Sequence, residues 1–204
     1  MDKPFTLREL YGLVAPARVT AATTGLLLVD FQLEFLTGRL VVEGGRAALE
    51  LAVTLLMWAR RHAIAVVHVR HVALRADSPV FAEGSPTAEL AIAPIGGELV
   101  VTKHQAGGFS GTELHALLQR LGVDTVIVAG IMTHLAVDVT ARDAAVLGYR
   151  VLVVADACAT RALPSAIDDD VISAHELHRT ALAALADRFA DVVGVADVLA
   201  LPCD

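Results

Sequence analysis

The sequence predicts a single α/β domain of three layers, in which helices cover both faces of a central parallel, doubly wound sheet of about six strands. Six short runs rich in Val, Leu and Ile alternate with longer stretches in which apolar residues recur at helical spacing. The runs are apolar on both faces, as is typical of buried parallel strands. Their alternation with helices indicates β-α-β units with right-handed crossovers throughout residues 1–204.

The expected elements follow these two patterns along the chain. Strands are expected at residues 25–30, 64–69, 98–102, 125–129, 150–155 and 191–195. Helices are expected at residues 46–61, 112–121, 135–147 and 173–189. Ser173 with Glu176 has the spacing of a capping box at the start of a helix, and Gly148 is a typical residue for ending one. The segment 72–97 is long, irregular and rich in Pro and Gly, which favours a functional loop or an interface.

Composition limits the classes of function. The chain has 204 residues, of which 55% are hydrophobic and 4% aromatic, so a sizeable core of Ala, Val and Leu is expected. The net charge of -7 and the lack of a Lys/Arg-rich run argue against a nucleic-acid partner. No apolar run approaches the roughly 20 residues that span a bilayer, and the first residues lack a signal-peptide core. We therefore expect a cytoplasmic protein with no membrane partner.

The cysteines and histidines predict no metal centre. Cys158 and Cys203 are far apart in the sequence and belong to no CxxC motif or Cys/His cluster. His68 and His71 lie at the end of the second expected strand, and a pair of this kind is more often structural than metal-binding. No metal and no cofactor are expected.

Two charged residues end apolar strands, where ligands of open α/β sheets bind. Asp30 taken alone is equally well interpreted as a helix N-cap or a turn residue. Lys103 taken alone is consistent with a side chain that extends to solvent. If their strands are neighbours, however, the two side chains meet at the edge of the sheet. A partly buried Asp–Lys pair is a common way to hold a poised proton acceptor.

The segment 130–136 joins an apolar strand to a helix through a tight turn. Such a turn directs backbone N–H groups toward one point, where the helix dipole adds positive potential. This arrangement suits an oxyanion hole, and a thiol placed there has a lowered pKa. An ordinary βα loop is the alternative. His134 has no obvious carboxylate partner, so packing or substrate contact is favoured over a role as general base.

These pieces, in this order, resemble the isochorismatase-like superfamily, and in particular its cysteine hydrolase branch. The matching stretches are residues 26–32, 100–104 with Phe109, 126–137, 138–145, 147–149 and 154–160. Each short motif is weak alone, but the ordered set covers nearly the whole chain. The resemblance implies hydrolysis of a C–N bond in a small amide, urea or carbamoyl compound, by a homodimer or homotetramer.

The resemblance also assigns roles to residues of the site. Asp30 is then the general base, Lys103 holds it, and residue 136 is the nucleophile position. A cis peptide bond is implied at Ile131–Met132, with an oxyanion hole formed by the N–H groups of Met132 and Ala136. The metal-binding nicotinamidase branch carries an Asp-x-His motif, which residues 31–75 lack. The candidates for binding the small-molecule substrate are Phe31, Gln32, Phe35, Gln105, Phe109, Thr133 and His134.

Residue 136 is the one plain departure from the family pattern, because it is Ala rather than Cys. A methyl group forms no covalent intermediate. Three explanations remain open: a Cys-to-Ala variant of an amidohydrolase, an isochorismatase-type enzyme that cleaves a vinyl ether without a nucleophile, or a pseudoenzyme that binds a ligand. A scaffold with a relic pocket is a further class. A pocket filled by its own side chains, or an unpaired Asp30 and Lys103, would favour it.

Overall fold

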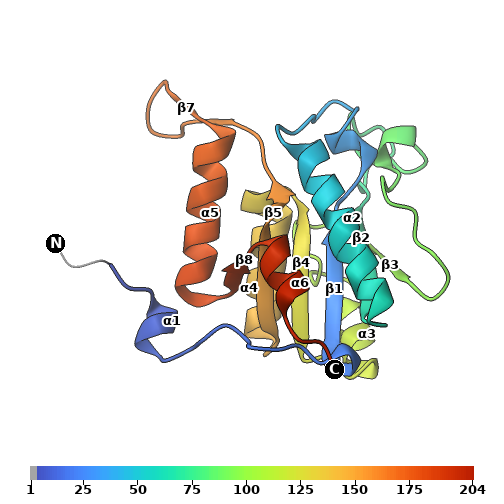
Figure 1. The fold of residues 1–204 in the computed structure, drawn as a ribbon. Helices are drawn as coiled ribbons and strands as arrows, with labels where there is room; N and C mark the ends of the chain where they lie inside the picture. The colour runs from blue at the N-terminus through green and yellow to red at the C-terminus, as the bar shows by residue number, and fades with distance from the viewer. Residues whose placement is uncertain (1–3) are drawn as a thin grey trace.

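Six parallel strands form the central sheet of the computed structural model, which describes residues 4–204 (Figure 1). In sequence the strands are β1 (Thr24–Val29), β2 (Ala65–His71), β3 (Leu99–Lys103), β4 (Thr125–Ile131), β5 (Arg150–Ala159) and β8 (Asp191–Val193). They are ordered β3-β2-β1-β4-β5-β8 across the sheet. The order reverses direction next to β1, because β2 and β4 lie on either side of it. Ligands bind at such a switch point in doubly wound sheets.

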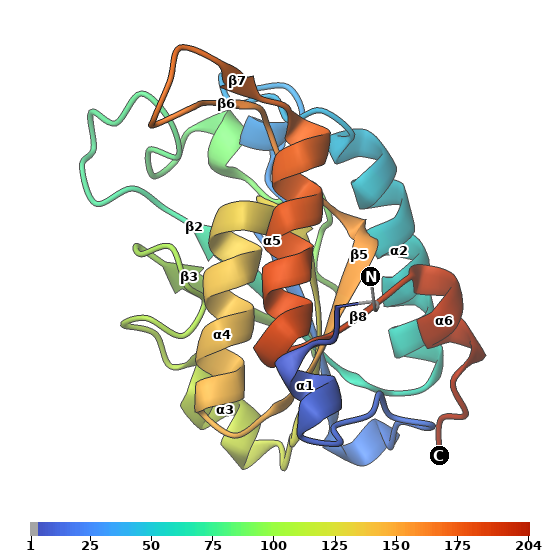
Figure 2. The ribbon, with the colours of Figure 1, turned by 90° about the vertical axis from the view of Figure 1, so that its left-hand side faces the viewer.

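Helices cover both faces of this sheet. One face carries α2 (Gly45–Arg61) and α6 (Val195–Ala200), and the other carries α3 (Leu114–Arg120), α4 (Asp138–Val146) and α5 (Ala174–Arg188) (Figure 2). The short elements are α1 (Leu7–Leu10), η1 (Ala21–Thr23), η2 (Leu33–Phe35), η3 (Pro86–Ala88), η4 (Thr133–Val137) and the hairpin β6–β7 (Leu163–Pro164 and Val171–Ile172). None of the helices described for residues 4–204 has the length and apolar character that a membrane crossing requires.

The alternating side chains of β1 show why its sequence is apolar throughout. Leu26 and Leu28 belong to the core cluster under α2 and α6, whereas Leu27 and Val29 belong to the cluster under α3, α4 and α5. All four are buried. Burying one such side chain stabilises the fold by about 1.5–3 kcal/mol. The central strand therefore holds the two helical layers together and carries Asp30 at its carboxyl end.

The structure confirms the predicted three-layer fold and corrects several boundaries. The expectation that every run is a central strand buried on both faces is wrong for β3, which is an edge strand on which Val100 is exposed. Residues 194–195 are not strand: Gly194 is the N-cap of α6, which the sequence prediction missed. The helix expected at 135–147 begins as the π-helical turn η4 and becomes α-helical only at Asp138. Ser173 caps α5 by accepting a hydrogen bond from the Glu176 N–H.

Gly130 in β4 lies opposite Val29 of β1, where the two strands leave no room for a side chain. A Cβ at this position would lie 2.3 Å from the carbonyl oxygen of Val29, which is a backbone atom that has little freedom to move. The pairing of β4 with β5 also shifts register between Val128 and Gly130. A side chain here would therefore displace the end of β4 and the loop that follows it.

We expect Gly130→Ala to lower the free energy of unfolding by about 3 kcal/mol, because overpacking against backbone forces the strands apart. Gly96→Ala is the matched control, since a Cβ at Gly96 has no atom within 4 Å. Urea unfolding of the two variants measures the difference. Equal stability of both variants would contradict the close approach of β4 to β1.

Candidate active site

Asp30 follows β1 directly and adopts a left-handed backbone conformation, with φ of 53°. Its N–H donates to the Val69 carbonyl at 2.8 Å, and its own carbonyl accepts from the Gln32 N–H at 2.7 Å. Non-glycine residues with positive φ are uncommon, although Asp tolerates this conformation better than most, and such residues cluster at functional sites. Asp30 is not a helix N-cap, because Gln32 holds that position for η2, and its side chain is buried although its backbone lies in a tight turn.

Lys103 ends β3 and pairs with Asp30. Its Nζ lies 2.7 Å from Asp30 Oδ2, and the two side chains are 2% and 4% exposed. Nζ also donates to the Gln105 carbonyl at 3.1 Å. From the sequence, the two side chains were expected to meet if their strands were neighbours. The strands are not neighbours, because β2 lies between β1 and β3. The pair forms nevertheless, because the long lysine side chain bridges the end of β2.

Burial, opposed by Lys103, brings the pKa of the Asp30 carboxyl close to neutral pH. Burial raises the pKa of Asp30 from 3.8 to about 6, while the charge of Lys103 and its hydrogen bond act in the opposite direction. Asp30 Oδ1 is buried and has no hydrogen-bond partner among the described residues. The carboxyl group is thus able to accept or donate a proton close to physiological pH.

The loop after β4 contains the unusual backbone that the family resemblance implies. The Ile131–Met132 peptide bond is cis. The turn η4 follows it, closed by a hydrogen bond from the Val137 N–H to the Met132 carbonyl at 3.2 Å. Thr140 Oγ1 donates to the Ala136 carbonyl at 2.6 Å and accepts from the Gly108 N–H at 2.9 Å. This threonine therefore connects residue 136 to the loop after β3.

Two further side chains of η4 form hydrogen bonds with residues of other elements. Thr133 Oγ1 lies 2.9 Å from His178 Nδ1 on α5. His134 Nδ1 makes a short hydrogen bond with Thr160 Oγ1, just beyond β5. Burial and the nearby charge of Arg161 lower the pKa of His134. The turn that carries Ala136 is thus anchored on both sides by hydrogen bonds.

These parts meet at one cavity of about 320 Å³. Asp30, Lys103, Met132 and Ala136 all line it. Much of the wall is apolar and comes from Phe35, Leu40, Val80, Phe81, Ile131 and Leu135. Val80 and Phe81 belong to the long segment 72–97, which therefore forms part of the site. Because the cavity is open and the Asp30–Lys103 pair is formed, neither feature that would favour a scaffold is present.

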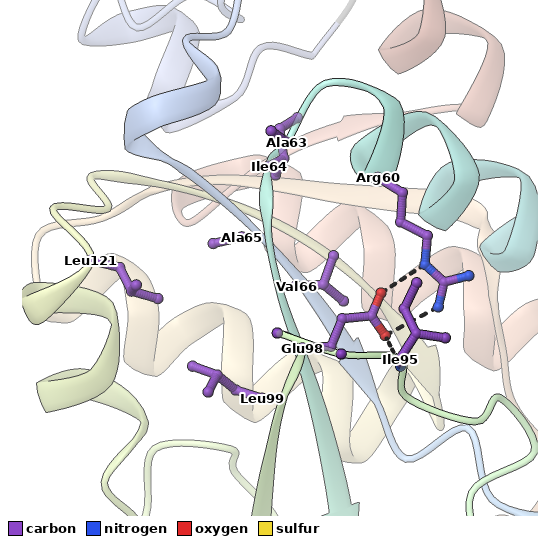
Figure 3. Close-up of a pocket in the computed structure, with 11 residues that line it drawn as sticks. Arg60, Ala63, Ile64, Ala65, Val66, Ile95, Glu98, Leu99 and Leu121 are labelled. Atoms are coloured by element: carbon purple, nitrogen blue, oxygen red, sulfur yellow. Dashed lines mark hydrogen bonds and ion pairs between the residues drawn. The ribbon is translucent and has the colours of Figure 1, made fainter.

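A larger cavity of about 440 Å³ lies at the amino ends of β2 and β3 (Figure 3). Glu98 is its buried carboxylate and accepts hydrogen bonds from Arg60 Nε at 2.7 Å and the Ile95 N–H at 3.0 Å. Its carboxylate also accepts from Arg60 Nη2 at 3.1 Å and lies 2.9 Å from His68 Nε2. Burial raises the pKa of Glu98, but these hydrogen bonds outweigh it and lower the value to about 2. Each polar group is thus already paired, which is typical of a structural cluster.

Of the residues expected to bind the substrate, the structure places only one in the wall of the cavity. Phe35 lines the cavity, whereas Phe31, Gln32, Gln105, Phe109, Thr133 and His134 do not. Phe31 is packed in the core. Gln32 is fully buried, with its amide bonded to backbone groups of His71 and Ala88. Phe109 stacks on Tyr149, and Gln105 contributes its carbonyl to Lys103.

Sequence reasoning missed His71, Phe81 and Arg161, all of which line the cavity. A signal was available for two of them, because His71 ends β2 and Arg161 lies just beyond the end of β5. Phe81 had none, since its place depends on how the irregular segment folds back.

Neither cysteine belongs to this cavity. Cys158 lies in β5 opposite Gly130, and burial raises the pKa of its thiol to about 12. Cys203 lies near the C-terminus, paired with Val19 in an isolated bridge. Within residues 4–204, no group of three or more His, Cys, Asp or Glu side chains is arranged to hold a metal ion.

The fold is a doubly wound α/β sheet with a buried carboxylate–ammonium pair beyond the carboxyl ends of its strands. Residues 24–197 match the family model of the isochorismatase domain. The chain is 32% identical over 195 residues to a secreted isochorismatase effector of Verticillium dahliae, across 95% of this chain and 98% of that protein. It is 35% identical over 156 residues to a maleamate amidohydrolase of Pseudomonas putida, across 67% and 72% respectively.

The fold comparison agrees with the sequence comparisons. An isochorismatase from Pseudomonas putida KT2440 superimposes with a TM-score of 0.86 and 35% identity, covering 96% of this chain and 100% of that one. The chain therefore belongs to the isochorismatase family, whose members include hydrolases that act on amides.

Removing Lys103 tests the buried pair directly. We expect Lys103→Met to lower the free energy of unfolding at pH 8 by about 3–5 kcal/mol, because it leaves a buried carboxylate unpaired. Without Lys103 the pKa of Asp30 rises further above about 6. At pH 5 the carboxyl is therefore protonated and neutral, and the loss should be smaller. Urea unfolding at the two pH values measures this difference.

The double variant Asp30→Asn/Lys103→Met is the control for that experiment. It carries neither charge and should recover most of the stability lost at pH 8. A loss that is the same at both pH values, and that the double variant does not relieve, would contradict a buried ion pair.

Proposed function

We propose that this site is of the Asp-Lys-Cys hydrolase type and acts on a C–N bond of a small amide, urea or carbamoyl compound, with Ala136 at the nucleophile position. The observation that carries the proposal is the buried Asp30–Lys103 pair on the same cavity as Ala136 and Met132. The amide-hydrolysing relatives of the family support the same reaction class.

The mechanism requires a cysteine at position 136. Asp30 takes the thiol proton, the thiolate attacks the substrate carbonyl carbon, and the N–H groups of Met132 and residue 136 stabilise the oxyanion. The protonated Asp30 then gives its proton to the departing amine, and the C–N bond breaks to leave a thioester. Asp30 takes a proton from water, whose oxygen attacks the thioester, and returns that proton to the thiolate. Lys103 favours the ionised carboxylate in each cycle.

The chain with Ala136 keeps the binding cavity and lacks the nucleophile. Losing a nucleophile typically lowers turnover by several orders of magnitude while leaving binding largely intact. In this proposal the chain is an inactive or impaired form of an amidohydrolase.

Arg161 adds a positive charge to the cavity wall. Its Nε is buried and has no hydrogen-bond partner among the described residues. An unpaired buried donor is costly, so a ligand that supplies an acceptor is favoured. We therefore expect substrates that carry a carboxylate besides the amide, as maleamate does.

Restoring a thiol tests the proposal. We expect Ala136→Cys to raise the rate of ammonia release from maleamate or a related acid amide by at least a thousandfold over the Ala136 chain. Ala136→Ser is the control, because a hydroxyl of similar size is far less readily ionised and should gain little. Ammonia release that stays at the background rate for every amide and urea tested in the Cys variant would overturn the amidohydrolase proposal.

A second candidate is the cleavage of a vinyl ether such as isochorismate, with Asp30 as general acid. Two observations favour it: no thiol lines the cavity within the described residues, and the raised pKa of about 6 makes Asp30 able to donate a proton. The similarity to a secreted isochorismatase effector supports the same chemistry.

The pH dependence of activity distinguishes the two candidates. A general base must be ionised, so amide hydrolysis by Ala136→Cys should fall as the pH drops below about 6. A general acid must be protonated, so cleavage of isochorismate by the Ala136 chain should instead fall as the pH rises above about 6. Profiles of kcat/KM for both substrates measure this. A limb near pH 4 in either profile would contradict the raised pKa of Asp30.

A further inference from the structure

His71 is a polar residue of the cavity wall that has no role in the mechanism proposed above. It is the last residue of β2, which lies between the strands that carry Asp30 and Lys103. Its side chain lines the same cavity as both of them. A ligand that fills the cavity therefore contacts His71 together with the ion pair.

The backbone of His71 is held by Gln32, the fully buried residue that the sequence placed in the pocket. Gln32 Oε1 accepts from the His71 N–H at 2.8 Å, and Gln32 Nε2 donates to the His71 carbonyl at 2.9 Å. Nε2 also donates to the Ala88 carbonyl at 2.6 Å. All these bonds fix the end of β2 against the segment around η3, so the direction of the His71 side chain is set.

The imidazole ring is fixed as well. It packs at 89° against the ring of Phe81, with 5.2 Å between the ring centroids. Phe81 itself packs on Phe35 at 5.2 Å and adopts a left-handed backbone conformation with φ of 55°. Positive φ is strained for an aromatic residue and is kept where the surroundings require it. The ring thus has one defined position in the cavity wall.

His71 Nδ1 is buried without a hydrogen-bond partner among the described residues. Asp30 Oδ1 and Arg161 Nε share this property, and all three residues line the one cavity. Buried polar atoms in native proteins are nearly always paired, so such a concentration of unpaired atoms indicates a place where a ligand completes the hydrogen bonds.

The charge state of the ring decides what Nδ1 offers to that ligand. Burial, followed by the charges of Lys103 and His104, lowers the pKa of His71 to about 4, and the Gln105 carbonyl opposes this only partly. The ring is therefore neutral at neutral pH and carries one N–H. With that N–H on Nε2, the unpaired Nδ1 is a hydrogen-bond acceptor.

We propose that His71 is a specificity-determining residue that binds the amide end of the substrate, its Nδ1 accepting a hydrogen bond from a substrate N–H beside Oδ1 of Asp30. Two acceptors match the two N–H bonds of a primary amide, a urea or a carbamoyl group. The site then selects these groups over N,N-disubstituted amides, whose nitrogen has no hydrogen to donate. This inference rests on the proposed amide-hydrolysing function and names its substrate class.

The first test needs no ligand. Histidine ¹⁵N NMR of the Ala136 chain at pH 7, with His71 assigned by its loss in His71→Asn, should show Nε2 protonated and Nδ1 bare. A proton on Nδ1 would overturn the proposal, because Nδ1 would then be unable to accept.

The second test compares two nearly isosteric replacements. His71→Asn retains an acceptor close to the position of Nδ1, whereas His71→Leu removes it. In calorimetric titrations of the Ala136 chain, succinamate should bind at least tenfold more tightly than N,N-dimethylsuccinamate. We expect His71→Leu to weaken succinamate binding about tenfold and to abolish the preference, while His71→Asn stays within about threefold of the parent chain.

Stability distinguishes ligand binding from a structural role. If His71 binds the ligand, the urea midpoint of His71→Leu should equal or exceed that of the parent chain, because an unpaired buried acceptor is removed. If His71 is structural, the midpoint should fall. A lowered midpoint, an unchanged preference in His71→Leu, or no binding of either probe would overturn the assignment of His71 and its substrate class. Turnover of amides by Ala136→Cys would still stand in that case, so failure of this inference is distinguishable from failure of the proposed function.

Discussion

The buried contact between the Asp30 carboxylate and the Lys103 ammonium is the interaction on which the site depends. Both side chains are almost inaccessible to solvent, so each charge would be strongly unfavourable without the other. The sheet order creates the contact indirectly, because it places β2 between the two strands and leaves the lysine to bridge it. The same order places β4 on the other side of β1, which positions Ala136 and the π-helical turn near the carboxyl group.

The surroundings of the pair show a division between structural and ligand-facing polar groups. Glu98, at the other end of β2 and β3, has hydrogen-bond donors on its carboxylate from three neighbouring residues and forms a closed cluster. At the active-site end, by contrast, Asp30 Oδ1, His71 Nδ1 and Arg161 Nε are buried without partners among the described residues. Unpaired buried atoms reduce stability, and they are tolerated where a substrate supplies the missing hydrogen bonds. This contrast supports the proposal that the smaller of the two cavities is the functional one.

The fold and the positions of Asp30, Lys103 and Ala136 were predictable from sequence, while most of the residues of the cavity wall were not. The apolar runs located every strand of the main sheet, because burial on both faces leaves a clear local pattern, although the edge strand β3 departs from it. Strand ends located Asp30 and Lys103, and the family resemblance located Ala136 and the cis bond. Gln32 was expected to contact the substrate. A polar residue next to Asp30 could face either the cavity or the backbone, and only the structure shows that its amide holds the His71 backbone. Phe81 was missed because segment 72–97 has no periodicity.

The account rests on a buried Asp30 whose proton affinity is set by desolvation against the charge of Lys103. A ¹³C NMR titration of the Asp30 carboxyl in the Ala136 chain measures this directly, with Asp30→Asn identifying the resonance. The account predicts a midpoint near pH 6, well above the ordinary value of 3.8. A midpoint at or below the ordinary value would mean that the charge of Lys103 outweighs the effect of burial, and it would contradict the poised acid–base group on which both candidate reactions depend.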